Sequence, residues 1–157
     1  MVDILLISHG PFCEGLLASL QMIAGPQEHV EALSLKEGQS PDDYRDQIEA
    51  KLKTFKKKSL VFCDIKGGTP YNSAGFLKSK FDFDLITGMN LPMLISVVTT
   101  RTESSTVDEL TNTALMNENK GIELINLSNQ GGHKHAKLSL NKDWWSFNSW
   151  SSHDSLE

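Results

Sequence analysis

The sequence predicts an α/β fold in which an open parallel sheet carries helices on both of its faces. Short apolar segments alternate with longer segments whose apolar residues recur at helical spacing, from the start of the chain to about residue 127. The short segments are apolar almost throughout, which is typical of strands buried on both faces. Strands that alternate with helical crossovers favour a parallel sheet.

The first two strands and the helix between them are expected within residues 3–35. Residues 3–8 should form a buried strand that runs directly into His9. The helix should stop at Gly25-Pro26, because glycine favours a helix end and proline cannot continue a helix. Residues 29–35 alternate well enough for the second strand. The apolar positions on one side of the helix are Leu16, Leu17, Leu20 and Ile23.

A strong helix start follows at residues 40–43, with the sequence Ser-Pro-Asp-Asp. It combines a capping hydroxyl, a proline in the first turn and acids near the positive end of the helix dipole. Lys56, Lys57 and Lys58 are interpreted as cations that close this helix, in preference to an anion site. The apolar stripe of the helix consists of Tyr44, Ile48, Leu52 and Phe55.

Strands and helices are expected to alternate over residues 59–127 as well. Residues 91–100 are ambiguous, because β-branched residues favour a strand whereas Pro92 after a Gly-x-Asn turn could open a helix. The other expected elements are a buried strand at 59–64, a helix near 71–80, a strand at 82–88, a helix marked by Val107, Leu110, Ala114 and Leu115 that ends at Gly121, and a last strand at 122–127.

The character of the chain changes after Leu127. Residues 128–157 contain a Gly-Gly pair, many Ser and Asn residues and all three tryptophans, without periodicity. We therefore expect one compact domain over residues 1–127, because 157 residues suffice for a single substantial core. Residues 128–157 are expected to be a tail that is disordered or packed on a partner subunit.

Composition excludes several classes of protein. A net charge of −5 and an isoelectric point near 5.5 argue against a nucleic-acid partner, which would require a basic face. No apolar stretch approaches the roughly 20 residues of a membrane span, and the first residues lack the basic start of a signal peptide. Cys13 and Cys63 are too few for a disulfide scaffold. These features predict a cytoplasmic protein with reduced thiols.

Polar residues that could support chemistry follow two of the predicted strands. His9 ends the first strand and Asp64 ends the third. The carboxyl ends of parallel strands lie at one edge of a sheet, so the two side chains should meet there. A carboxylate would hold one imidazole nitrogen protonated and leave the other as a nucleophile or base. A strand-end histidine that is merely structural or exposed is the alternative.

A candidate anion site follows Asp64 in the sequence. Gly67, Gly68 and Thr69 come directly before a predicted helix, whose free N–H groups suit an anion such as phosphate. Ser8, beside His9, is added to the candidate phosphate-binding residues. A tight turn made by the two glycines is the structural alternative.

No metal or cofactor site is predicted. His29 begins a strand at the opposite edge of the sheet and is expected to be a surface residue, and the His-Lys-His segment at 133–135 lies in the polar tail. Cys13 and Cys63 are interpreted as small packing residues, since no C-x5-R loop follows either of them. No phosphate-binding loop of the G-x-x-x-x-G-K-[ST] type is present.

A histidine followed by glycine also suggests a histidine phosphatase, which carries an arginine before the histidine. Here that residue is Ser8, and the chain has only Arg45 and Arg101. Turnover of a phosphoester requires a guanidinium clamp on the phosphoryl oxygens. Without one, a site would hold a phosphoryl group lightly and hand it on, as a carrier does.

Three segments together give the chain a family resemblance. They are Ser-His-Gly at 8–10, DIKGGTPYN at 64–72 and GMNLPM at 88–93. With them, the chain resembles the enzyme IIA component of the mannose class of the phosphoenolpyruvate-dependent sugar phosphotransferase system (PTS). The resemblance runs from residue 2 to about 127. The G-G-[ST]-P-x-N pattern separates the chain from the related phosphocarrier of dihydroxyacetone kinase.

The resemblance implies specific roles for the candidate residues. His9 would accept a phosphoryl group from the phosphohistidine of HPr and pass it to the IIB component. Asp64 would orient His9, and Thr69 with the neighbouring amides would hold the phosphate. Lys66 is assigned no role. The family fold implied is a four-stranded parallel sheet with an additional antiparallel edge strand, exchanged within a homodimer.

The same resemblance implies a place in sugar uptake. The IIC and IID membrane components would be indirect partners, so the protein would approach the membrane only through the transport complex. The sequence of a IIA component does not identify the transported sugar, because such a component contacts only HPr and IIB. The alternatives are a histidine-dependent phosphohydrolase, opposed by the missing arginines, and a regulatory module on the same scaffold, opposed by the intact set of His9, Asp64 and Thr69.

Overall fold

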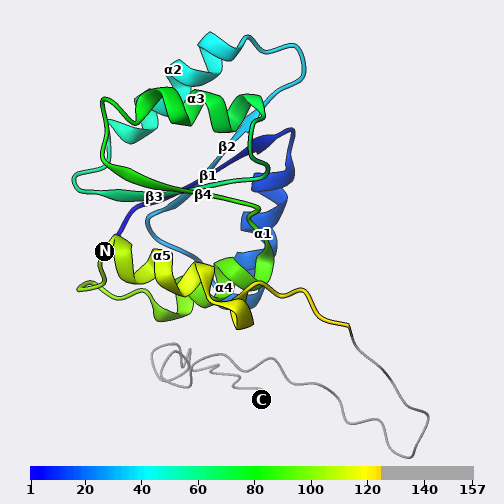
Figure 1. Ribbon diagram of the computed structural model, residues 1–157, viewed down its shortest axis with the longest axis vertical. Helices are drawn as coiled ribbons and strands as arrows, with labels where there is room; N and C mark the ends of the chain where they lie inside the picture. The colour runs from blue at the N-terminus through cyan, green and yellow to red at the C-terminus, as the bar shows by residue number, and fades with distance from the viewer. Residues whose placement is uncertain (125–157) are drawn as a thin grey trace, which may run out of the picture. The chain divides into compact units, whose positions relative to one another are not determined.

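The computed structural model describes residues 1–124, and Met1–Ile122 form one compact unit. This unit has three layers (Figure 1). The central layer is a sheet of four strands: β1 (Ile4–His9), β2 (Val30–Leu35), β3 (Ser59–Cys63) and β4 (Phe83–Thr87). All pairings are parallel and the strand order is β2-β1-β3-β4. The predicted α/β class and parallel sheet are confirmed.

Helices cover both faces of the sheet, as the alternating pattern predicts. Helices α2 (Pro41–Leu52) and α3 (Thr69–Leu77) lie on one face. Helices α1 (Phe12–Ala24), α4 (Leu91–Thr100) and α5 (Val107–Leu115) lie on the other. A short 3-10 helix, η1 (Asn117–Asn119), follows α5.

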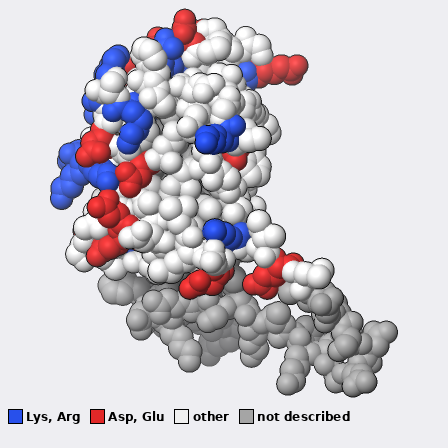
Figure 2. Space-filling model, in the orientation of Figure 1, with Lys and Arg blue, Asp and Glu red and all other residues white. Residues whose placement is uncertain are grey.

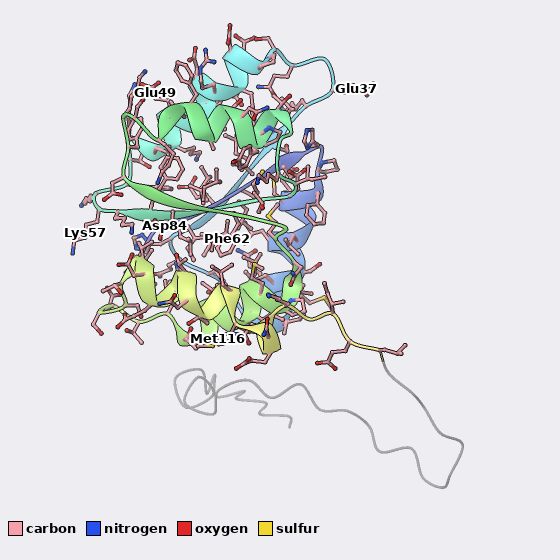
Figure 3. The ribbon with its side chains drawn as sticks, in the orientation of Figure 1. Glu37, Glu49, Lys57, Phe62, Asp84 and Met116 are labelled. Carbon is pink, nitrogen blue, oxygen red and sulfur yellow. The ribbon has the colours of Figure 1, made fainter. Side chains whose placement is uncertain are left out.

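The alternation of side chains along the central strands divides the core into two clusters. Ile4, Leu6 and Phe62 pack towards α1, α4 and α5, and Phe62 is labelled between the sheet and these helices in Figure 3. Leu5 and Ile7 pack with α2 and α3 on the opposite face. Since β1 and β3 are buried on both faces, their carboxyl ends are held in fixed positions.

Local capping chemistry explains where three helices begin. The Ser40 hydroxyl accepts a hydrogen bond from the Asp43 N–H at 3.1 Å, so the predicted start of α2 is confirmed. The Asn90 side chain accepts from the Met93 N–H at 3.0 Å, which makes the ambiguous segment 91–100 the helix α4. Thr106 and Glu109 form a reciprocal capping box at the start of α5.

Several predicted boundaries differ from the structure, among them the helix expected near 71–80, which is α3 at Thr69–Leu77. Helix α2 ends at Leu52, so Lys56–Lys58 lie in the connection to β3 and do not close a helix. Helix α5 ends at Leu115, before the 3-10 turn, and not at Gly121. Residues 122–124 have no strand structure.

The remaining predictions for the C-terminal part are not tested. Residues 125–127 of the expected edge strand, the domain end near residue 127, the tail and the His-Lys-His segment all lie outside the described residues. No helix in residues 1–124 is long and apolar enough to cross a membrane.

Candidate functional site

His9 is the last residue of β1 and the first one in this strand that reaches solvent. Ile4 to Ser8 are fully buried, whereas 46% of the His9 side chain is exposed. The chain turns sharply at Gly10, which has φ +54°, and the Gly10 N–H donates to the carbonyl of Leu35 at 2.8 Å. The histidine is therefore presented at the carboxyl edge of the sheet on a rigid strand.

Asp64 meets His9 because their strands are neighbours. Ile7 of β1 is in register with Cys63 of β3, so His9, two residues after Ile7, and Asp64, directly after Cys63, both lie where these neighbouring strands end. Nδ1 of His9 lies 2.7 Å from Oδ2 of Asp64. The main-chain N–H of His9 donates to the same oxygen at 2.9 Å. The structure thus brings together the two residues that sequence analysis pairs.

Hydrogen bonds keep the Asp64 carboxylate ionised. Burial raises the pKa of this carboxyl, but bonds from the His9 N–H, the His9 ring and the Ile65 N–H outweigh it and lower the pKa below its usual range. The Ile65 N–H donates to Oδ1 at 2.7 Å. An ionised carboxylate only accepts hydrogen bonds, so Nδ1 of His9 must carry the proton of this bond. In a neutral imidazole with this tautomer, Nε2 keeps its lone pair.

Cys63 contributes a contact that sequence analysis does not predict. Its thiol donates to Oδ1 of Asp64 at 3.3 Å from inside the core. Burial, with the nearby Asp64 carboxylate, raises the pKa of the thiol to about 12, so the group remains a hydrogen-bond donor. Cys13 is buried as well, and desolvation raises the pKa of its thiol. The interpretation of both cysteines as packing residues agrees with their burial.

The loop after Asp64 lies against the other edge of the imidazole. A Cβ added to Gly68 would stand 2.4 Å from Cε1 and 2.9 Å from Nε2 of His9. Only glycine therefore allows this approach. The neighbouring Gly67 has φ +85°, and the Asn72 side-chain amide donates to its carbonyl at 3.0 Å. This hydrogen bond stabilises the conformation of the loop beside the histidine.

Helix α3 begins where this loop ends. Its N-terminus has no side-chain cap, and its first residue is the half-buried Thr69. The first N–H groups of a helix have no partner within the helix, and they favour an anion there. Gly68 thus lies against the Nε2 side of His9, and Thr69 follows it as the first residue of α3.

Ser8 does not join this group. It is fully buried, and its hydroxyl donates to the Gly10 carbonyl at 3.2 Å and accepts from the Cys13 N–H at 2.8 Å. Adjacent residues of a strand point to opposite faces, so Ser8 supports the start of α1 while His9 faces solvent. We therefore omit Ser8 from the candidate phosphate site.

Two exposed apolar side chains follow His9 and Asp64 in the sequence. Phe12 begins α1, three residues after His9, and Ile65 follows Asp64 directly. Their exposed fractions are 48% and 60%. Exposed apolar side chains suit contact with a protein, because a partner that covers them removes their apolar area from water. Sequence analysis assigns these residues no role.

Both arginines are engaged away from His9. The Arg45 guanidinium pairs with Asp42 at 2.8 Å and lies 4.7 Å from the centre of the Phe76 ring. The buried Arg101 donates to the carbonyls of Val2, Glu28 and His29. His29 lies at the amino end of β2, at the opposite edge of the sheet from His9, as predicted. Within residues 1–124, no cluster of three or more His, Cys, Asp or Glu side chains could hold a metal ion.

Comparisons with known proteins find similar sequences over most of the described residues. Residues 3–115 match the family model described as "PTS system fructose IIA component". The fructose-specific EIIA component of Bacillus subtilis is 30% identical over 121 residues, 75% of this chain and 83% of that protein. The mannose-specific EIIAB component of Escherichia coli K12 is 28% identical over 127 residues, 79% of this chain. The match covers 39% of the Escherichia coli protein, so this chain corresponds to only part of it.

Solved structures give the same result. The EIIA component of Streptococcus agalactiae superimposes with a TM-score of 0.72 at 34% identity, covering 78% of this chain and 96% of that one. The mannose/sorbose-specific IIA subunit of Enterococcus faecalis gives a TM-score of 0.73 at 29% identity, covering 81% and 96%.

Proposed function

The chain belongs to the fructose- and mannose-type IIA family of the sugar phosphotransferase system, and from this premise we propose that it is a phosphocarrier that works through His9. The observation that carries the proposal is the contact between Nδ1 of His9 and Oδ2 of Asp64, which leaves Nε2 as the free nucleophile. The donor would be the phosphohistidine of HPr, and the acceptor would be a IIB component.

The transfer step requires no proton to leave the attacking atom. The lone pair of Nε2 attacks phosphorus, the bond between phosphorus and the donor's ring nitrogen breaks, and the donor nitrogen keeps the electron pair. The Nδ1 proton stays on His9, so the phosphorylated ring carries a positive charge. Asp64, whose pKa is lowered, stabilises that charge through the 2.7 Å contact.

The phosphoryl oxygens would lie at the start of α3. The uncapped first turn of this helix supplies N–H groups, and the Thr69 hydroxyl supplies one further donor. No arginine contacts this region among the described residues, since Arg45 and Arg101 are engaged elsewhere. Hydrogen bonds without a guanidinium clamp suit a group that must be released to the next carrier.

The partner proteins would dock on the exposed apolar side chains of Phe12 and Ile65. Phe12, three residues after His9, and Ile65, directly after Asp64, are both exposed. A transfer between two phosphohistidines requires the donor and acceptor rings to approach without intervening side chains. Exposed apolar residues with few charges permit such contact with two different partners in turn.

Phosphorylation from the physiological donor tests the proposal. The protein is incubated with phosphoenolpyruvate, enzyme I and HPr, and bound phosphate is measured by mass spectrometry. We expect one acid-labile, base-stable phosphoryl group on His9, and none on the His9→Ala variant. His29→Ala is the matched control and should accept one group at the wild-type rate. Phosphate on His29, or on the His9→Ala protein, would contradict the proposal.

A further inference from the structure

A second histidine–carboxylate pair lies at the opposite end of the sheet. Nδ1 of His29 is 2.8 Å from Oδ1 of Asp3, nearly the same separation as between His9 and Asp64. Asp3 precedes β1 and His29 precedes β2. About half of the His29 side chain is exposed. The proposed phosphocarrier role does not use this pair.

The backbone of His29 is held in an unfavourable conformation. Its φ is +58°, and no other residue except glycine has a positive φ in the described part of the chain. The buried Arg101 guanidinium donates to the His29 carbonyl at 3.2 Å and to the Glu28 carbonyl at 2.6 Å. The Ile4 N–H donates to the same His29 carbonyl at 2.9 Å. Strained residues that their surroundings fix in this way cluster at functional sites.

A cavity of about 450 Å³ opens beside this pair. Asp3, His29 and Glu31 line one side of it, and residues 54–57 line the other. Its volume lies within the range of small-molecule sites. Phe55 is half-buried there and offers an apolar wall. In Figure 3, Lys57 marks this end of the sheet and Glu37, just after β2, marks the opposite end.

The charges around the cavity leave two lysines available. Asp3 is hydrogen-bonded to His29, Glu31 pairs with Lys51, and the terminal amine of Met1 pairs with Glu103 at 2.8 Å. Lys56 and Lys57 make no ion pair with any residue of the described range. Figure 2 shows basic side chains gathered at this side of the unit, with acidic ones between them. Two unpaired ammonium groups beside an imidazole favour a phosphate group.

We propose that this cavity binds a small phosphorylated metabolite. Its phosphate lies between Lys56, Lys57 and the Nε2 edge of His29, and the remainder packs against Phe55. Asp3 accepts the Nδ1–H of the ring, so Nε2 is the ring atom left for the phosphate, to which it donates once it takes up a proton with the ligand. The site is separate from His9, because the strand β1 between them spans roughly 20 Å.

Titration with inorganic pyrophosphate tests the proposal on the full chain. Imidazole and amide NMR signals report His9 and His29 separately. We expect saturable shifts of His29 and of residues 54–57. The Lys56→Ala/Lys57→Ala double variant should weaken this binding about tenfold or more. Its phosphorylation by HPr should be unchanged. Lys36→Ala, an exposed lysine at the opposite end of the sheet, is the matched control and should bind normally.

A second variant and a second probe separate the possible outcomes. His29→Asn keeps a residue type that tolerates positive φ but removes the imidazole, and it should weaken pyrophosphate binding several-fold. Shifts confined to His9, or equal affinity in the double variant, would overturn the proposal. Phosphatidylglycerol vesicles provide the lipid form of phosphate. If the protein sediments with these vesicles but does not bind pyrophosphate in the titration, the proposal is also overturned. The ligand would then be a membrane surface.

Discussion

The imidazole of His9 lies against Gly68 so closely that any added Cβ would stand 2.4 Å from its Cε1 atom. Real Cβ atoms do not approach a ring carbon to this distance, so one of the two residues would have to move. His9 is also held from its other side by Asp64 at 2.7 Å. The ring therefore occupies a slot between a carboxylate and a glycine, with Nε2 at the glycine side.

Gly68→Ala should displace the ring and slow phosphorylation of His9 by HPr at least about tenfold, since small displacements of reacting groups are costly. The fold should persist, because Gly68 has an ordinary extended φ of −76°. Gly75→Ala is the control on the same helix. Its added Cβ meets nothing within 4 Å, so transfer should be normal and thermal stability unchanged or slightly higher. A wild-type rate of transfer by Gly68→Ala would show that the close contact between Gly68 and the His9 ring is not required.

Asp64→Asn should slow phosphoryl transfer by about tenfold or more. The amide keeps the shape of the carboxylate, but it neither fixes Nδ1 as the protonated nitrogen nor neutralises the phosphorylated ring. The measurement is the initial rate of phosphorylation, with ¹⁵N NMR of the His9 ring to follow the tautomer. Asp3→Asn changes the corresponding partner of His29 and should transfer at the wild-type rate. A wild-type rate for Asp64→Asn would exclude Asp64 from the mechanism.

Thr69 variants separate the hydroxyl from the shape of the side chain. Thr69→Ser keeps the hydroxyl and should transfer normally. Thr69→Val keeps the branched shape but loses the hydroxyl. A hydrogen bond to a charged group contributes roughly 1.5–3 kcal/mol, so the Val variant should be slower by about tenfold to a hundredfold. Single-turnover transfer from phosphorylated HPr measures the difference. Equal rates for the two variants would contradict a role for the hydroxyl.

Cys63 variants test the thiol bond to the Asp64 carboxylate. Cys63→Ser retains a donor at the same position, whereas Cys63→Ala removes it and leaves Oδ1 with the Ile65 N–H alone. We expect the Ala variant to raise the pKa of the Asp64 carboxyl relative to wild type, measured by ¹³C NMR of its side chain. The Ser variant should restore the wild-type value. An unchanged pKa in Cys63→Ala would mean that the thiol only packs.

Within residues 1–124 the outer edge of β4 has no strand partner, and this supports the prediction of a homodimer. A groove of about 580 Å³ runs beside this strand and is lined by Leu85, Thr87, Thr111 and Leu115, among others. An exposed strand edge invites pairing with another strand, and residues 122–127 are the predicted partner from a second subunit. Truncation after residue 120 should yield a monomeric or aggregating protein. Truncation after about residue 130 should keep the dimer. Analytical ultracentrifugation compares both with the full chain, and a stable full-length monomer would refute the prediction.

The sheet and the central pair could be predicted because strong local signals agreed with the topology. Continuous apolar runs determined β1 and β3, and the parallel arrangement then placed His9 and Asp64 at one edge. The end of α2 could not be predicted in the same way. A tight turn follows Leu52, with the Phe55 N–H bonded to the Leu52 carbonyl at 3.2 Å. This turn keeps Phe55 on the buried side, so the apolar spacing continues although the helix has ended.

The contacts of Gly68, Cys63 and Arg101 were beyond sequence analysis for a related reason. Each depends on a distance between segments far apart in the chain, and no spacing along the sequence encodes it. Gly68 looks like any turn glycine, and Cys63 looks like any small core residue. In the sequence, Arg101 matters only because it is not placed next to His9, where it could clamp a phosphate. Its contacts with three main-chain carbonyls, including that of Val2, follow from where α4 ends.

The strand order has a consequence for how the protein fluctuates. Both β1 and β3 are interior strands, each paired on two sides, and they carry the two partners of the His9–Asp64 bond. Separating the pair by opening the backbone would require breaking the middle of the sheet, which in most domains happens only with global unfolding. Amide hydrogens of Leu6, Ile7 and Phe62 should therefore exchange with solvent at the slowest rates in the protein. The outer strand β4 pairs only with β3 among the described residues, so its outward-facing amides should exchange faster than those of β1 and β3.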